Sequence, residues 1–482
     1  MKPRSLTGRA LARFRFTRNL FPLPLATLLI AFSVSVSARD VGEFFNQNCA
    51  NCHGRDLQGG SAPSLLTNVW KHGSDDASIA RSIAEGYPTN GMPSWKGALT
   101  DGEIRAMVVL IHEKQARAKR KETVFPKPNE DEIVKSEVES FRIKTVVDDL
   151  DTPWSLTFLP DHRMLVTELP GKLRVIENGQ VSRPVAGIPR ARVQGQGGLM
   201  AVALHPGYAT NGWIYLSFTD RSQNGDAMTE VVRGRLQDNR WTDQEIIFRA
   251  PENLYRSGGI QYGCRLVFDH HGHLFFTIGD CGHKEDSQDI TRPNGKVHRV
   301  MLDGQIPQDN PFVNTSNAVP SIWSYGHRNQ QGLAQDPVTG ELWATEHGPR
   351  GGDELNLIRP GLNYGWPVIT YGMDYNGSPI SALTAKEGME QPVTYWTPSI
   401  AVSAITFYTG DQFPHWKNNL FVSSLAAQEL RRLVLKQDKV QSQEILFKDI
   451  GRIRDVITGP DGFLYVVLNS PGKIVRLEPA KE

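Results

Sequence analysis

The sequence shows no excess of charge of either sign. It contains 53 Lys and Arg residues against 52 Asp and Glu residues, which gives a net charge of +1. No basic stripe of the kind that nucleic-acid binding requires runs along the chain. We therefore expect no nucleic-acid partner, and the overall charge gives no attraction to a membrane surface. At 482 residues the chain is long enough for more than one domain.

Long apolar runs are absent beyond the N-terminal region. In that region a basic stretch precedes an apolar run over residues 20–36, which ends in small residues. This order is typical of a cleaved secretory signal peptide. The alternative is a retained anchor, but Pro22 and Pro24 shorten the uninterrupted run to well below the ~20 residues that span a bilayer. We expect residues 1–38 to be removed on export, a periplasmic location and no stable membrane insertion.

Cysteine is scarce, and two of the four cysteines form one motif. Cys49, Cys52 and His53 make the C-x-x-C-H pattern of covalent haem c attachment, in which both thiols bind the haem and the histidine ligates its iron. A structural zinc site or a disulfide framework would need a second ligand pair nearby. The other two cysteines, Cys264 and Cys281, lie far downstream, so haem attachment is the interpretation we adopt.

A second axial ligand for the haem iron is present in a Gly/Pro loop. Met92 is flanked by glycine and proline, and methionine in this role raises the reduction potential. Thr100 and Glu103 then form a capping box. It predicts a helix with an apolar face, whose members are Ile104, Met107, Val108 and Ile111. Residues 39–113 resemble a class I cytochrome c, which implies a small all-α domain.

Residues 114–140 change in composition. They are densely charged, nearly free of aromatic residues and interrupted by Pro126 and Pro128. This composition predicts an extended linker instead of packed structure.

From residue 141 onward a turn followed by a β-rich hydrophobic strand recurs. The six copies begin roughly 45 to 80 residues apart, a period expected of propeller blades. They start at Pro160, Pro206, Asp269, Asp336, Phe413 and Gly459. A β-sandwich also has regular strands and turns, but so wide a spacing fits it poorly. We predict an all-β six-bladed propeller over residues 141–482, preceded by the all-α cytochrome domain.

One long loop and several short ones are candidates for a ligand site at a propeller mouth. Residues 346–367 are rich in glycine, proline and carboxylates, and unpaired carbonyls beside carboxylates suit Ca²⁺. The alternative is a long acidic surface loop. Arg328, Arg452 and Arg454 lie in glycine-flanked turns, and converging arginines suit a ligand rich in anionic oxygens. Singly, each would more often be a surface residue or an ion-pair partner.

Five motifs are together similar to those of one enzyme family. GQGGL, GHRNQQGLA, EHGPRGGDELNLI, NYGWP and RIRDVITGPDG resemble the soluble aldose dehydrogenases that depend on pyrroloquinoline quinone (PQQ), the glucose/sorbosone dehydrogenase family. The resemblance covers residues 141–478 and implies a six-bladed propeller. It also implies oxidation of a sugar to a lactone by hydride transfer to PQQ, with Ca²⁺ as Lewis acid.

The resemblance assigns roles to individual residues. The carbonyls of Gly348 and Pro349 would hold Ca²⁺, and Gln196 would line the sugar side of the reacting centre. The contacts to PQQ would come from Arg328, which also belongs to the reacting centre, and from Asn329, Ser399, Arg452 and Arg454.

Two positions depart from the family pattern. Gln261 stands where the family has its histidine base, and Ala426 stands where it has a lysine that contacts PQQ. Glutamine takes no proton near neutral pH, and losing a general base typically costs about 10²–10⁴-fold in rate. Tyr262 or a neighbouring carboxylate is an alternative base, and the sequence selects neither.

Three hypotheses follow for the whole chain. The first is an exported dehydrogenase that passes electrons from a sugar through PQQ to its own haem c and on to a soluble cytochrome or respiratory chain. The second is a degenerate propeller that binds sugar or quinone without turnover. The third, a calcium-dependent lactone hydrolase, leaves the haem unexplained. In an oxidising compartment Cys264 and Cys281 would form either a disulfide or two buried thiols.

Overall fold

The computed structural model describes residues 39–66, 70–122 and 128–480. The predicted signal peptide lies outside the described residues. In the part of the chain that the structure describes, no helix is both long enough and apolar enough to cross a membrane.

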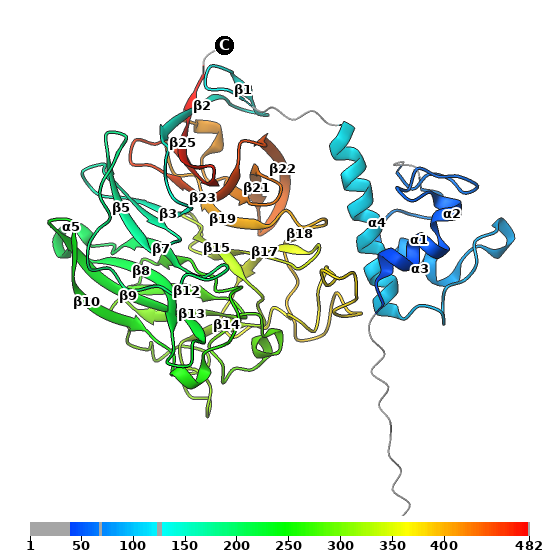
Figure 1. Cartoon of the computed structure of the whole chain (residues 1–482), viewed down its shortest axis with the longest axis horizontal. Helices are drawn as coiled ribbons and strands as arrows, with labels where there is room; N and C mark the ends of the chain where they lie inside the picture. The colour runs from blue at the N-terminus through cyan, green and yellow to red at the C-terminus, as the bar shows by residue number, and fades with distance from the viewer. Residues whose placement is uncertain (1–38, 67–69, 123–127, 481–482) are drawn as a thin grey trace, which may run out of the picture. The chain divides into compact units, whose positions relative to one another are not determined.

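The first described segment is helical, as the cytochrome resemblance predicted (Figure 1). Asp40 caps the first helix, since its Oδ1 accepts a hydrogen bond from the Gly42 N–H (2.7 Å). The capping box forms too: the Thr100 N–H donates to Glu103 Oε2 (2.8 Å) and the Glu103 N–H to Thr100 Oγ1 (3.2 Å). The elements are α1 (Val41–Asn48), α2 (Ala50–His53), α3 (Asp76–Glu85), the 3₁₀ turn η1 (Pro88–Asn90) and α4 (Asp101–Glu122).

Helix α4 extends into the segment for which the sequence predicted an extended linker. Residues 114–122 continue the helix, and Val134–Lys135 forms the short strand β1. The reason is that 114–122 contains only good helix formers such as Lys, Arg, Gln, Ala and Glu.

In the described part of the chain the remaining strands form six antiparallel sheets, one of five strands and five of four. The predicted propeller is therefore confirmed, and each recurring hydrophobic segment is the second strand of a blade. In order, the blades are β3 (Pro153–Phe158), β4 (Met164–Glu168), β5 (Lys172–Glu177) and β6 (Gln180–Val181); β7 (Leu199–Leu204), β8 (Ile214–Arg221), β9 (Ala227–Gln237) and β10 (Arg240–Phe248); β11 (Leu266–Phe268), β12 (His273–Ile278), β13 (Lys296–Met301) and β14 (Ile322–Tyr325); β15 (Gln330–Gln335), β16 (Leu342–Glu346), β17 (Asp353–Ile358) and β18 (Thr394–Trp396); β19 (Val402–Phe407), β20 (Leu420–Ser424), β21 (Glu429–Lys436) and β22 (Lys439–Lys448); and β23 (Arg452–Thr458), β24 (Leu464–Ser470) and β25 (Gly472–Pro479) with β2 (Ser140–Val147) and β1. Short helical turns lie in the loops, namely α5 (Tyr208–Asn211), η2 (Glu252–Leu254), η3 (Lys284–Gln288) and η4 (Pro414–Trp416).

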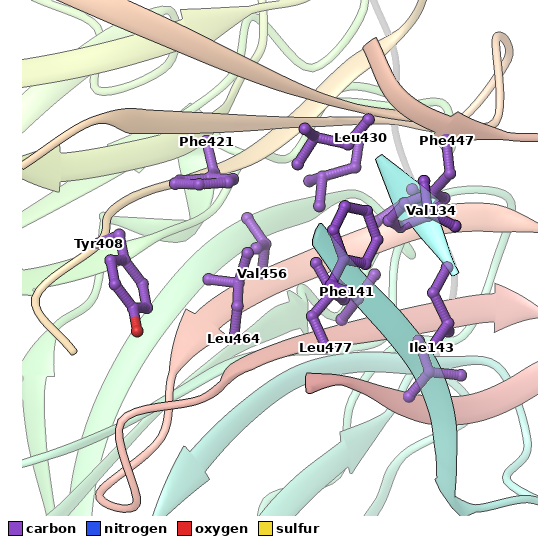
Figure 2. Close-up of a cluster of buried hydrophobic side chains, with 14 of the residues drawn as sticks. Val134, Phe141, Ile143, Tyr408, Phe421, Leu430, Phe447, Val456, Leu464 and Leu477 are labelled. Carbon is purple, nitrogen blue, oxygen red and sulfur yellow. The ribbon is translucent and has the colours of Figure 1, made fainter. Parts of the chain in front are cut away.

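The two ends of the propeller sequence close the ring. Strand β2 pairs with the C-terminal strand β25, so that Phe141 lies opposite Pro479, and the two strands are adjacent in Figure 1. Phe141 is fully buried and its ring packs against Trp416 (centroids 5.5 Å apart) and Phe447 (6.3 Å). Figure 2 shows this apolar cluster, which joins the last two blades. Its burial stabilises the attachment of β2 to the last blade.

The first strands of the six blades contact one another in a closed circle, β3–β7–β11–β15–β19–β23, and line the central channel. The predicted quinone and sugar residues lie just before these strands or at their first residues. They therefore come from different blades to one end of the channel.

Candidate functional site

Three arginines lie near one partly buried imidazole, that of His347, at this end of the channel. Burial, followed by the charges of Arg328, Arg454 and Arg452, lowers the pKa of His347 well below its usual value. The side chain is uncharged near neutral pH. Arginines that lie far apart in the sequence therefore meet, and together they present fixed positive charge to a ligand.

Arg454, like Arg328, is buried, whereas Arg452 is exposed. One of its guanidinium nitrogens donates to Gln331 Oε1, which also lies 3.1 Å from His347 Nε2. Burial and the nearby Arg265 and Arg452 lower the Arg454 pKa to about 9. Its buried Nε–H has no acceptor among the described residues. A buried donor without an acceptor is costly, and a carboxylate ligand such as PQQ would supply one.

The loop predicted to hold calcium is folded tightly at Gly348. A Cβ atom there would lie 2.3 Å from the carbonyl oxygens of both Gly351 and Gly352, so only glycine fits. The Gly348 N–H donates to Asp353 Oδ1 (2.8 Å), and Arg328 Nη1 donates to the carbonyls of His347 (3.0 Å) and Gly348 (2.9 Å). Pro349 is buried next to it. These contacts fix carbonyl oxygens of the type that Ca²⁺ prefers.

Asp353 connects this loop to the next blade, and sequence reasoning gave it no such role. Its Oδ1 accepts from the Ser399 hydroxyl (2.7 Å) as well as from Gly348, and its Oδ2 accepts from the Val402 N–H (3.2 Å). Burial raises the Asp353 pKa. Asp353 thus positions both a predicted calcium ligand and a predicted quinone contact.

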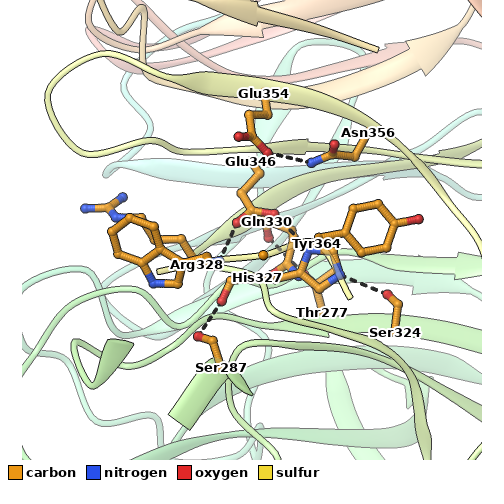
Figure 3. A network of polar contacts seen from close by, with 12 residues as sticks. Thr277, Ser287, Ser324, His327, Arg328, Gln330, Glu346, Glu354, Asn356 and Tyr364 are labelled. Atoms are coloured by element: carbon orange, nitrogen blue, oxygen red, sulfur yellow. Dashed lines mark hydrogen bonds and ion pairs between the residues drawn. The ribbon is translucent and has the colours of Figure 1, made fainter. Parts of the chain in front are cut away.

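Glu346 and Glu354 turn toward the protein instead of toward a cation site (Figure 3). Glu346 accepts from the Arg328 N–H and lies 2.8 Å from His327 Nδ1, while His327 Nε2 lies 2.9 Å from Ser324 Oγ. Burial raises the Glu346 pKa and lowers that of His327, so both are uncharged near neutral pH. Within the described residues no group of three His, Cys, Asp or Glu side chains could hold a metal. Calcium would depend on the loop carbonyls.

The sugar side of the predicted centre is built around Gln196 and Gln261. The Gln261 N–H donates to Gln196 Oε1 (2.8 Å), and Gln261 adopts a positive φ of 61°. The Asn329 Oδ1 accepts from the Gly263 N–H (3.0 Å), which ties Asn329 to the same loop. Ala426 is exposed in the blade 5 loop, and its N–H donates to the Ile400 carbonyl (3.1 Å).

Two candidates for the missing base can now be compared. Burial raises the pKa of Tyr262 to about 12, so its hydroxyl keeps its proton near neutral pH. Burial raises the pKa of Asp280 to about 6, against the opposing charge of Arg328. The Asp280 N–H donates to the Arg328 carbonyl (2.7 Å), and the Cys281 N–H donates to the Gln261 carbonyl (3.0 Å). The Asp280 backbone therefore lies beside Arg328 and the Gln261 loop, and its buried carboxyl titrates in a range that suits a base.

The haem motif occupies one short helix. Cys52 is exposed and Cys49 half-buried, both as free thiols on α2 or directly before it. Burial lowers the pKa of His53, which favours the neutral imidazole that binds metals. Met92 follows η1 and pairs with Tyr87 in an isolated β-bridge. These donors suit a haem c, and ligation by His53 and Met92 stays a prediction.

Cys264 and Cys281 are described as free, buried thiols. Burial raises the pKa of Cys264 to about 11 and that of Cys281 well above its usual value. Both thiols are therefore unreactive in this state, which agrees with two buried thiols and not with a disulfide.

A propeller mouth lined with arginines and loop carbonyls, preceded by a helical domain with a c-type haem motif, defines a redox protein with an oxyanion-binding site. The Glucose / Sorbosone dehydrogenase family matches residues 150–476, and the Cytochrome C oxidase, cbb3-type, subunit III family matches residues 36–111. The chain belongs to the glucose/sorbosone dehydrogenase family and carries a cytochrome c domain. It is an oxidoreductase that acts on CH–OH donors.

Individual proteins agree with this placement. Aldose sugar dehydrogenase YliI of Escherichia coli (strain K12) is 43% identical over 345 residues, 70% of this chain and 92% of that protein. The crystal structure of soluble aldose sugar dehydrogenase from E. coli in the apo-form has a TM-score of 0.67 and 40% identity, over 70% of this chain and 100% of that one. The PQQ-bound aldose sugar dehydrogenase from Streptomyces coelicolor has a TM-score of 0.59 and 27% identity, over 70% and 98%.

Proposed function

We propose that this protein is a periplasmic quinoprotein that oxidises an aldose, or a related hydroxyl compound, to a lactone and passes the electrons to its own haem c. The observation that carries the proposal is the convergence of Arg328, Arg452 and Arg454 on His347, with the Arg454 Nε–H left without an acceptor. PQQ is the ligand proposed for them. The name of the S. coelicolor relative supports this choice.

Two sets of residues would hold the two cofactors. Arg328, Arg452, Arg454, Asn329 and Ser399 would hold the carboxylates and carbonyls of PQQ. The carbonyls of Gly348 and Pro349 would hold Ca²⁺. When bound, PQQ supplies a two-electron acceptor and Ca²⁺ polarises its carbonyl.

Asp280 is the base that we assign in place of the family histidine. It lies beside Arg328 and the Gln261 loop, and its pKa of about 6 leaves it ionised near neutral pH. Its Oδ2 accepts from the Trp366 Nε1–H (2.9 Å) and its Oδ1 from the Gly282 N–H (2.8 Å), which fix the carboxylate in place. Gln196 would orient the sugar.

A second function is favoured by Gln261 and Ala426, which replace a base and a quinone contact of the family pattern. It is a propeller that binds sugar or quinone without turnover. The two functions differ in one respect that can be measured: only the enzyme transfers electrons from the substrate to the haem.

The test uses the haem-loaded chain with Ca²⁺ and PQQ. Aldoses, polyols and alcohols are offered in turn while the absorption of reduced haem is followed. Haem reduction that requires both PQQ and a substrate supports the enzyme. PQQ binding without haem reduction by any of the compounds would support the binding protein instead.

A further inference from the structure

Helix α4 is buried on two faces. The face predicted from the sequence packs in the helical domain with Ile104, Met107, Val108 and Ile111. A second stripe, consisting of Gly102, Arg105, Val109 and Glu113, is also buried, with Val109 0% and Glu113 5% exposed. Its spacing of three or four residues defines another side of the helix. A charged residue such as Glu113 is almost never buried unless it is paired.

Propeller residues cover this second face. The helical and propeller residues belong to one unit of contacting residues, Arg39–Glu482. Both Glu113 oxygens lie 3.0 Å from Arg350 Nε, and Glu113 Oε2 lies 2.8 Å from Arg350 Nη2. Arg105 Nη2 donates to the Tyr371 carbonyl (3.3 Å), and its guanidinium lies 5.6 Å from the Tyr371 ring centroid.

Apolar contacts extend the interface on both sides of the ion pair. Met373, a propeller residue, is fully buried in the hydrophobic cluster of the helical domain. The Val41 N–H donates to the Gly377 carbonyl (3.2 Å). A Cβ atom on Gly102 would lie 3.1 Å from Pro379 Cβ. The contact therefore combines a paired charge, a hydrogen-bonded backbone and close packing, as specific interfaces do.

The propeller side of this interface is the loop that we assign to calcium and PQQ. Gly348 and Arg350 are separated by one residue, yet the Gly348 carbonyl is held by Arg328 of the channel whereas the Arg350 side chain binds α4. At Gly351 an added Cβ would lie 3.1 Å from Val109 Cγ1, so the loop backbone rests directly on the helix. The loop is a wall shared by the quinone site and the haem domain.

We propose that the Glu113–Arg350 pair docks α4 onto this loop, and that electrons leave the quinone across the loop to the haem of the same chain. This inference rests on the proposed function. Each CH–OH group that is oxidised to C=O releases two electrons and two protons. The haem iron takes one electron at a time, Fe(III) to Fe(II), so it must be reoxidised twice per turnover by an external one-electron acceptor, such as a soluble cytochrome. The protons go to solvent.

Charge reversal tests the docking contact on the full haem-loaded chain. The variants are Glu113→Arg, Arg350→Glu and the double exchange Glu113→Arg/Arg350→Glu. The control is Glu85→Arg, which makes the same charge change at an exposed position on α3. Amide hydrogen exchange over residues 102–113 and 371–377 is measured without PQQ or calcium, which makes the readout independent of activity.

We expect each single variant to exchange at least about tenfold faster over these residues, because one buried charge loses its partner. The double exchange should restore protection, and the control should not change it.

The electron path is tested by comparing two acceptors in the loaded protein. In Glu113→Arg we expect sugar-dependent haem reduction to slow at least about tenfold, while reduction of a small dye that takes electrons directly from the quinone stays unchanged. The isosteric Glu113→Gln should slow haem reduction in the same direction, which guards against misfolding of the reversed variant. A haem absorption spectrum that differs from that of the wild type would report such misfolding.

Two results would overturn the proposal. One is wild-type exchange and wild-type haem reduction in both Glu113 variants. The other is a failure of the double exchange to restore either property when both single variants retain their haem spectrum. If the wild type reduces neither dye nor haem with any sugar, the proposed function fails. The exchange measurement still decides whether the docking contact exists.

Discussion

At the scale of single residues, Asp280 gives the clearest dependence on pH. A base works in its deprotonated form, and the Asp280 pKa is raised to about 6. Turnover should therefore be present above about pH 6 and be lost as the pH falls through that value. Asp280→Asn should lower kcat by about 10²–10⁴-fold and remove this limb of the pH profile. Steady-state kinetics with a quinone-linked dye measures both, and an unchanged profile in the variant would exclude Asp280 as the base.

Gln261 provides the complementary experiment. Because its backbone is bonded to Gln196 and Cys281, a histidine at this position would lie in the same centre. We expect Gln261→His to restore at least part of the activity lost in Asp280→Asn. The measurement is kcat of the double variant against Asp280→Asn alone. No gain, with PQQ still bound, would mean that position 261 does not face the substrate.

Asp353 holds the predicted calcium loop and Ser399 through one carboxylate. Asp353→Ala leaves the buried N–H groups of Gly348 and Val402 without their acceptor, at about 1–3 kcal/mol each. We expect PQQ to bind more weakly in the presence of Ca²⁺. The measurement is a titration of the apo protein with PQQ. Exposed Asp148→Ala is the matched control and should bind as the wild type does. Equal affinities in both variants would contradict the positioning role.

The residues that the sequence identified and those that it missed differ in a physical way. Arg328, Arg454 and Gly348 stand in glycine-rich turns, whose composition is visible along the chain. Asp280 and Gln331 also lie in glycine-flanked segments, but their sequence neighbours do not reveal their roles. Their roles come from neighbours in other blades, such as Trp366 for Asp280 and Arg454 for Gln331. Only the folded ring brings these pairs together.

At the scale of elements, closure of the ring depends on β2. Phe141→Ala removes a fully buried ring from the cluster that joins the last blades. We expect a loss of about 3–5 kcal/mol in the free energy of unfolding, measured by denaturant titration. Val138→Ala, 44% exposed just before β2, should change it by less than about 0.5 kcal/mol. Similar losses in both variants would argue against a special role for β2 in closure.

The elements also show where sequence patterns succeed. The second strands of the blades were predictable because each follows a turn and is continuously apolar. The first strands were not, since β11 has only Leu266–Phe268 and its register is set by its neighbours. Helix α4 was predicted from its cap, but its second buried face was not, because Arg105 and Glu113 resemble solvent-facing charges until their partners Tyr371 and Arg350 are known.

At the scale of the whole molecule, the helical domain, the predicted calcium loop and the channel arginines form one continuous path of contacts. Glu113 binds Arg350, the next residues of the loop fold back at Gly348, and Gly348 is held by Arg328. In the proposed electron path, substrate oxidation and haem reduction therefore occur within one molecule. A shuttle between two copies would not need this interface.

The most direct test is the dependence of haem reduction on protein concentration. The haem-loaded protein with Ca²⁺ and PQQ is mixed with excess sugar at a series of dilutions, and the appearance of reduced haem is followed in time. Electron transfer within one molecule predicts a first-order rate constant that is the same at every dilution. A rate constant that falls in proportion to the protein concentration, or haem that stays oxidised while a dye is reduced, would contradict it.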